Sequence, residues 1–285
     1  MPATTRKKNT SLPVQGEEET DGADGEDGED REDGAVAKKG SQCSVKGKAY
    51  ELQIARACRQ FQSPHMNIAF LTQTDDKLGG CGADIDILLN WKNESDIGVE
   101  AKRPTPDWMQ MKLRREEGGH WIGVENNKIP KRSKELFDSI LQSFVLFGGK
   151  IPAFCERKLT YVEWKSLKQA NPEFKDHYLV CPPDTIANLY REKHCQYLQV
   201  LGKGLYHTGE DVCGFGVPFF RCEQRIRIRC KVHTEKDSRG FASLSVTAAA
   251  QPAKSKMADL PKSAYSLDSV PSMPPQLVRI VSKQT

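Results

Sequence analysis

The amino-acid sequence predicts an α/β or α+β domain built around a mixed central sheet. Residues 47–62 have a helical apolar period, and residues 84–101 contain two apolar runs separated by a polar turn. Residues 224–232 alternate strictly between basic and apolar side chains, which is typical of a strand with two different faces. Helix, strands, helix and strand therefore follow one another, as expected for a mixed sheet.

The ends of the chain differ in composition from its middle. Residues 1–34 contain 11 acidic and 4 basic side chains, a net charge of −7, which leaves +11 for the remainder of this 285-residue chain. An acidic run with so little to bury cannot offset its ordering entropy, so we expect residues 1–40 to be disordered. Ala, Ser, Pro and Lys dominate after residue 238, which predicts a flexible tail over 238–285. Residues 41–237 remain as one domain with a C-terminal β extension.

The first predicted helix covers residues 47–62. Tyr50, Ile54, Cys58 and Phe61 fall on one face of it, and Glu51 borders that face. A strand is expected over 66–74, followed by a Gly-rich loop.

The charged stretch after that loop predicts a β-hairpin with arms 84–89 and 97–101 and a turn over 90–96. Pairing Leu89 with Ile97 places Asp86 opposite Glu100 and Asp84 opposite residue 102, and directly paired residues share one face of a sheet. A shift of one residue would divide the charged side chains between the two faces.

Four further elements follow. We expect helices over 130–149 and 183–195 and strands over 177–181 and 224–232. In the last strand, four basic residues alternate with apolar ones and form a cationic stripe: Arg225, Arg227, Arg229 and Lys231.

The carboxylates of the hairpin suit a hard cation such as Mg²⁺, with Mn²⁺ as an alternative. The backbone carbonyl of Ala101 can add a third oxygen. A bound Mg²⁺ activates water for attack on a phosphodiester, and Lys102, on the same face as Glu100, can hold that water or offset charge in the transition state. Two acids and a lysine in this order therefore predict phosphodiester hydrolysis.

An upstream helical Glu51, then Asp86, then Glu100-Ala101-Lys102 resembles the PD-(D/E)xK nuclease superfamily, which includes restriction endonucleases and archaeal Holliday-junction resolvases. The family core is αβββαβ, and it matches the predicted elements over about residues 44–183. The resemblance implies that Asp86 and Glu100 bind the metal, that Glu51 adds to the site and that Lys102 assists the water. The nominal Pro-Asp pair is absent, which leaves Asp84 and Asp86 as alternative ligands; Asp86 is favoured because it faces Glu100.

The same resemblance implies a Mg²⁺-dependent DNA endonuclease or exonuclease acting in DNA repair, recombination or viral genome processing. A looser resemblance links residues 197–231 with C-terminal parts of nuclease-like proteins of large DNA viruses. Three alternatives stay open: an inactive nucleic-acid-binding protein that keeps the fold, a virion interaction protein that works through its tails, and a sheet edge whose charges only prevent aggregation.

DNA is the expected partner, because the net charge of +11 suits a phosphate backbone. Besides the cationic stripe, Arg103, Gln110 and Lys112 are candidates for DNA contact, and Gln110 or Gln142 could supply the glutamine that family members place on a following helix. Cleavage of both strands would favour a homodimer, and the tails could bind a protein partner.

The sequence contains no apolar run of about 18 residues, so no membrane span is expected. Nine cysteines without a CxxC pair, and no signal-peptide core at the N-terminus, favour a reducing intracellular compartment, with the nucleus, a viral factory or a virion as settings.

Overall fold

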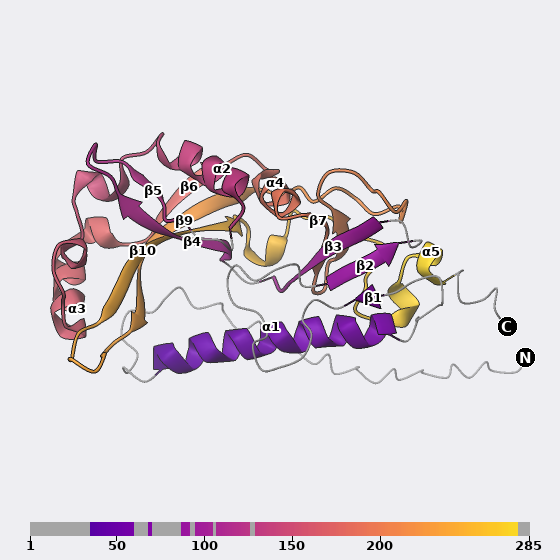
Figure 1. The fold of residues 1–285 in the computed structure, drawn as a ribbon, viewed down its shortest axis with the longest axis horizontal. Helices are drawn as coiled ribbons and strands as arrows, with labels where there is room; N and C mark the ends of the chain where they lie inside the picture. The colour runs from indigo at the N-terminus through magenta and orange to yellow at the C-terminus, as the bar shows by residue number, and fades with distance from the viewer. Residues whose placement is uncertain are drawn as a thin grey trace, which may run out of the picture.

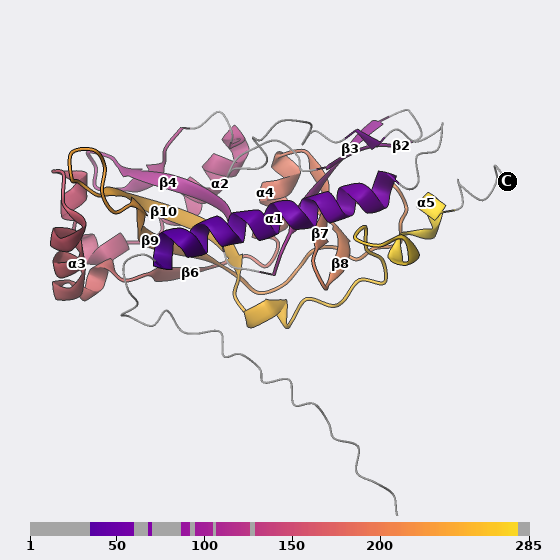
Figure 2. The same cartoon turned by 90° about the horizontal axis from the view of Figure 1, so that it is seen from below.

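The fold is taken from a computed structural model that describes residues 35–59, 68–69, 87–91, 95–104, 107–125 and 129–278. Two five-stranded sheets lie beside each other, and a long helix, α1 (Ala35–Arg59), runs lengthwise beneath both (Figures 1 and 2). Residues 1–34, the greater part of the predicted disordered segment, lie outside the described residues. Residues 35–40, which were also expected to be disordered, instead form the first turns of α1.

The first sheet has the strand order β1-β2-β3-β7-β8. Its strands are β1 (Ile68–Ala69), β2 (Ile87–Trp91), β3 (Ser95–Lys102), β7 (Cys195–Val200) and β8 (Gly204–His207). β1, β2 and β3 are antiparallel, β3 pairs with β7 in parallel, and β7 pairs with β8 in antiparallel fashion. Helix α4 (Thr185–Glu192) directly precedes β7. The order α1, β1, β2, β3, α4, β7 is the expected αβββαβ core around a mixed sheet, which confirms the predicted fold class.

Helix α1 packs on the first sheet through the face that the sequence predicts. Tyr50, Ile54 and Cys58 are buried, and they share a core with Val99 of β3 and Tyr197 of β7. Phe61, the fourth residue of the predicted face, lies outside the described residues. Because burial of this stripe holds α1 against β3, the helix can bring its polar edge to the same strand.

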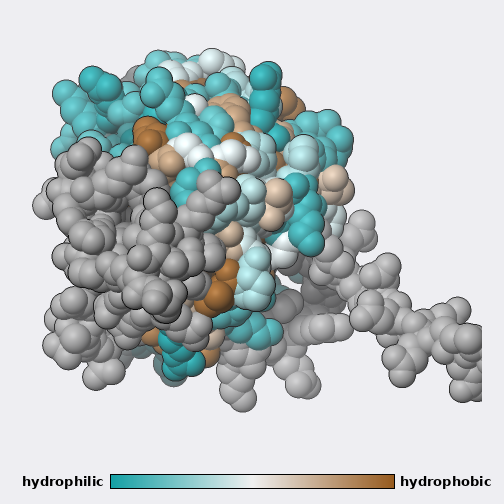
Figure 3. Space-filling model, turned by 90° about the vertical axis from the view of Figure 1, so that its right-hand side faces the viewer, coloured by the Kyte–Doolittle hydropathy of each residue, from teal (hydrophilic) through white to brown (hydrophobic). Residues whose placement is uncertain are grey.

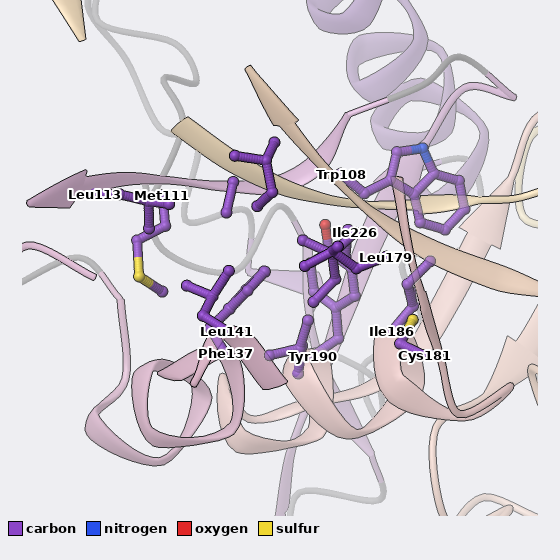
Figure 4. Close-up of a cluster of buried hydrophobic side chains, with 14 of the residues drawn as sticks. Trp108, Met111, Leu113, Phe137, Leu141, Leu179, Cys181, Ile186, Tyr190 and Ile226 are labelled. Carbon is purple, nitrogen blue, oxygen red and sulfur yellow. The ribbon is translucent and has the colours of Figure 1, made fainter. Parts of the chain in front are cut away.

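The second sheet is antiparallel throughout, in the order β5-β4-β10-β9-β6. Its strands are β4 (Trp108–Arg115), β5 (Trp121–Gly123), β6 (His177–Cys181), β9 (Gln224–Thr234) and β10 (Ser243–Pro252). Apolar side chains of α2 (Lys131–Leu141) and α4 meet those of β4, β6 and β9 in one core (Figure 4). Helix α3 (Tyr161–Ala170) lies at the far end of this sheet (Figure 1).

Two predicted elements differ from expectation: one strand belongs to the other sheet, and one helix is shorter. The strand at 177–181 forms as β6, but it pairs with β9 in the second sheet, and β7 is the strand that lies parallel to β3. The helix expected over 130–149 ends at Leu141, and a separate short turn covers Leu146–Gly149. Phe147 and Gly148 have φ values of 55° and 60° there, which a continuous α-helix cannot accommodate.

The flexible tail expected after residue 238 is contradicted by β10, which lies between β4 and β9 at the centre of the second sheet. Its Ala248 and Ala250 are buried in the core. Beyond it, the chain returns to the first sheet through the short turns Ser255–Met257 and Val270–Ser272 and the short helix α5 (Pro275–Val278). Leu267, Met273 and Leu277 of this C-terminal segment are buried in the core that α1 shares with the first sheet.

Among the described residues, no helix is both long and apolar enough to cross a membrane. On the end of the molecule that carries the first sheet, described apolar residues form small separate groups among hydrophilic ones (Figure 3).

Candidate active site

The register of the hairpin is the predicted one. Leu89 pairs with Ile97, and the ladder of β2 and β3 continues unbroken from Trp91 opposite Ser95 to Ile87 opposite Val99. Asp84 and Asp86 lie outside the described residues, so their position beside Glu100 and Lys102 stays a prediction. The other residues of the predicted motif, Glu100 and Lys102, belong to β3 and are described.

Glu100 is the centre of the site. It lies in β3 between β2 and β7, opposite Leu198, and only 4% of it is exposed. Its Oε1 accepts a hydrogen bond from Lys102 Nζ, and its Oε2 accepts one from Lys193 Nζ at 3.0 Å. The thiol of Cys195 lies 3.7 Å from the same Oε2. Both oxygens of this buried carboxylate therefore have cationic partners.

The aromatic ring of Tyr190 lies beside both lysines. Lys102 Nζ is 5.4 Å from the ring centroid and Lys193 Nζ is 5.9 Å from it. The ring belongs to α4 and is almost completely buried. A cation near an aromatic face is attracted by the ring quadrupole, so Tyr190 helps to hold the two ammonium groups around Glu100.

Burial and charge act in opposite directions on Glu100. Removal from water alone would raise the pKa of its carboxyl group, but Lys102 and Lys193 outweigh that effect and hold the pKa below its usual range. Glu100 is therefore ionised at neutral pH in spite of its burial.

Glu51 of α1 interacts electrostatically with the same charged groups. Its Oε2 atom is buried and has no hydrogen-bond partner among the described residues. Burial raises the pKa of Glu51, the charge of Lys102 opposes this, and the charge of Glu100 adds to it. The structure thus brings together three residues that the sequence proposed: Glu51, Glu100 and Lys102.

The described residues agree in chemistry with a hard cation. The unpartnered carboxylate oxygen of Glu51 and the carboxylate of Glu100 are oxygen ligands of the type that Mg²⁺ prefers. Within the described ranges, no group of three or more His, Cys, Asp or Glu residues is placed to hold a metal ion. Ala101 lies between Glu100 and Lys102, and its side chain belongs to the core that α1 shares with the first sheet. The role of its carbonyl oxygen as a metal ligand stays a prediction.

The cationic stripe of β9 lies on the face of the second sheet opposite its core, and two of its arginines are paired with acids. Arg227 donates to Asp176, with an Nε–Oδ2 distance of 2.7 Å, and its Nη1 lies 3.6 Å from Asp107. Arg229 forms an ion pair with Asp107 at 2.9 Å. Arg225 instead stacks on Tyr178, 4.0 Å from the ring centroid. Arg227 and Arg229 therefore form ion pairs that connect β9 with Asp176 and Asp107.

Other candidate DNA-contacting residues lie on the same sheet face. Lys112 of β4 and Arg229 of β9 flank Thr247 of β10, so all three share one cross-strand row. Lys231 donates to Gln110 at 3.0 Å across β10. By contrast, Arg103 belongs to the connection after β3, and Gln142 is an exposed residue at the end of α2.

Lys193 is the site residue that sequence reasoning missed. It is the C-cap residue of α4, 93 positions after Glu100. A lysine at a helix C-terminus is ordinarily explained by the helix dipole, so nothing local distinguishes it. Only the parallel pairing of β7 with β3 places it beside Glu100.

No family model matches the chain, and no curated protein matches it. Among solved structures, it is similar to HhaI endonuclease in complex with DNA, with a TM-score of 0.34 and 12% sequence identity. The match covers 66% of this chain and 61% of that chain, so less than two thirds of the endonuclease is represented. The fold described above rests on the strand order and register, independently of this likeness.

Proposed function

We propose that this chain is a metal-dependent DNA nuclease that hydrolyses phosphodiester bonds by attack of a water molecule. The observation that carries the proposal is the buried carboxylate of Glu100, ionised on the central strand β3 between two lysines. Nearby, a carboxylate oxygen of Glu51 has no hydrogen-bond partner in the described part of the chain. Burying such a cluster costs free energy. A purely structural role explains it less well than a chemical one.

The residues divide into two roles. Glu51, Glu100, the carbonyl of Ala101 and Asp86, with Asp84 as the alternative, would hold the ion. When bound, Mg²⁺ supplies an activated water and neutralises developing negative charge, and Mn²⁺ can substitute for it. Lys102, held by Glu100 and by the Tyr190 ring, orients the attacking water and offsets charge on the phosphoryl oxygens in the transition state.

DNA is the proposed substrate because the chain after residue 34 carries a net charge of +11. The face of the second sheet opposite its core adds basic side chains, including Lys112 and Arg225. Contacts between such residues and phosphates position a duplex without specifying its sequence. DNA repair, recombination and viral genome processing in an intracellular setting are the processes that we propose.

A second candidate is a protein that binds nucleic acid without cleaving it. One observation favours it: both oxygens of Glu100 are already paired with lysines, so the described site is electrically satisfied by the chain itself. In that case the cluster would be a structural ion-pair network.

One experiment separates the two candidates. The full chain is incubated with linear, circular, branched and single-stranded DNA in Mg²⁺ or in EDTA, beside Lys102→Ala, Glu100→Gln and the exposed control Glu117→Gln. We expect cleavage only with Mg²⁺, unchanged rates for the control, and losses of about a hundredfold or more in the two site variants, the usual cost of removing one charge-stabilising group. DNA binding without any cleavage would establish the second candidate, and cleavage that survives both substitutions would refute the site.

A further inference from the structure

The described carboxylates of the site have cationic neighbours without any metal. Lys102 and Lys193 place two ammonium groups beside Glu100, and Lys48 adds a further positive charge near Glu51. Glu100 could not remain ionised at this depth without partners, because an isolated buried carboxylate is strongly disfavoured. The lysines therefore act as internal counter-ions for a carboxylate that the proposed function also assigns to a cation.

The two lysines are not equivalent. Lys102 lies two residues from Glu100 on the same strand, so it stays on the same face of β3 whatever else the site contains. Lys193 reaches Glu100 from the end of α4, and its side chain is 11% exposed against 21% for Lys102. It occupies Oε2, the oxygen that also faces the Cys195 thiol.

The backbone around Lys193 holds it in this place. The next residue, His194, has a φ of 62°, a left-handed conformation that is uncommon for a residue other than glycine. This turn ends α4 and leads directly into β7, whose parallel pairing with β3 aligns Cys195 with Gly98. The direction of the Lys193 side chain is therefore set by the junction of two core elements.

We propose that Lys193 is a positioning residue that neutralises Glu100 in the metal-free protein and competes with a divalent cation for its Oε2 oxygen. This inference rests on the proposed function, because it assumes that Glu100 is a cation ligand. It explains how the site remains folded before a cation arrives. It also requires the Lys193 ammonium group to leave Glu100 when a cation binds.

The competition is measured directly as Mn²⁺ affinity, by titration calorimetry on the full chain. Lys193→Met removes the charge at similar length, Lys193→Arg keeps it, and Lys165→Met is a matched control on the exposed side of α3. We expect Lys193→Met to bind Mn²⁺ roughly tenfold more tightly, the factor that about 1.4 kcal/mol represents. Its melting temperature in EDTA should fall by about 4 °C. The Lys193→Arg and Lys165→Met proteins should resemble wild type.

A second measurement uses the wild-type protein alone and so does not depend on a variant that folds. Lysine acetylation is followed by mass spectrometry with and without Mn²⁺. We expect the labelling of Lys193 to rise severalfold on Mn²⁺ addition while that of Lys165 stays constant.

The outcomes separate this inference from the proposed function. If wild type binds Mn²⁺ and cleaves DNA, but neither the affinity of Lys193→Met nor the labelling of Lys193 changes, the competition is refuted and the nuclease proposal stands. If no protein binds Mn²⁺ and none cleaves DNA, the proposed function fails, and the competition fails with it.

Discussion

Glu51 and Glu100 are two carboxylates in one site with opposite electrostatic environments. The pKa of Glu100 is lowered by two lysines in spite of burial, whereas burial raises the pKa of Glu51 and only the charge of Lys102 and weaker basic neighbours oppose it. Groups whose environments separate their pKa values are typical of functional sites, although structural ion-pair networks produce the same effect.

The raised pKa of Glu51 predicts a pH effect on the metal-free protein. A group with a raised pKa in the folded state adds stability at low pH, and that stability is lost as the pH rises through its folded pKa. In EDTA, Glu51→Gln should therefore increase the free energy of unfolding at pH 7, because the amide has no charge to bury; the gain should be about 1 kcal/mol, as is common for one favourable substitution. Urea unfolding between pH 4 and pH 8 measures this.

The control for this prediction is Glu117→Gln, which replaces an exposed carboxylate in the turn between β4 and β5. Glu51→Gln should also flatten the decline of stability with rising pH. A Glu51→Gln protein with the same pH profile as wild type would show that Glu51 does not carry a buried charge.

At the scale of elements, β9 illustrates how a predicted strand can acquire a second role. Its alternating pattern correctly places Ile226 and Ile228 in the core and the basic residues on the other face. The structure then pairs Arg227 and Arg229 with Asp107, in the connection between β3 and β4. Asp107 has a φ of 73°, so the connection bends sharply where the ion pairs hold it. Through these ion pairs, the cationic stripe of β9 contacts the connection that follows β3, the strand of the candidate site.

A double-mutant cycle tests this link. Asp107→Ala should lower the free energy of unfolding by about 2 kcal/mol, because it removes partners from partly buried arginines. The coupling energy between Asp107→Ala and Arg229→Met should exceed about 0.5 kcal/mol, whereas Asp107→Ala and Arg225→Met should be additive within that range. Additivity in both cycles would mean that the ion pair between Asp107 and Arg229 does not stabilise the fold.

For the whole molecule, the C-terminal segment contributes to the packing of α1 on the first sheet. Gln199 of β7 is completely buried; its Nε2 donates to Tyr50 Oη of α1 at 3.0 Å, and its Oε1 accepts from the backbone N–H of Leu267 at 2.9 Å. The side chain of Leu267 lies in the core that α1 shares with β3. Because Glu51 belongs to α1, the end of the chain supports one side of the candidate site.

Truncating Leu267 should therefore weaken both the fold and the site. Leu267→Ala should cost about 2–5 kcal/mol in the free energy of unfolding, as other buried leucines do when a cavity is left. Leu52→Ala, which shortens an exposed leucine of α1, should change it by less than about 0.5 kcal/mol. Urea denaturation of both variants checks the difference. Equal effects would mean that the C-terminal segment does not contribute to the core.

Much of the fold was predictable where the signal was local. The apolar face of α1 and the alternation of β9 follow from helical and strand periods within a few residues. The start of α3 has a local signal as well, because Thr160 and Glu163 form a capping box there. β4 also has a local signal, because apolar and polar residues alternate from Met109 to Arg114. β7 carries mixed polar and apolar residues without a clear period, and Ala-rich β10 resembles a linker in composition, so these two strands could not be assigned from local pattern.

The hairpin register, the placement of Glu100 and Lys102 on one face of β3, and the docking face of α1 follow from the amino-acid sequence alone. These depend on side-chain periods of two or 3.6 residues, which any short segment expresses alone. By contrast, three features emerge from the folded molecule: β7 lies beside β3, Lys193 pairs with Glu100, and β10 is a central strand. These features depend on which strands, distant in sequence, bury apolar surface against one another. The free energy of that burial is a property of the whole core and not of any single segment.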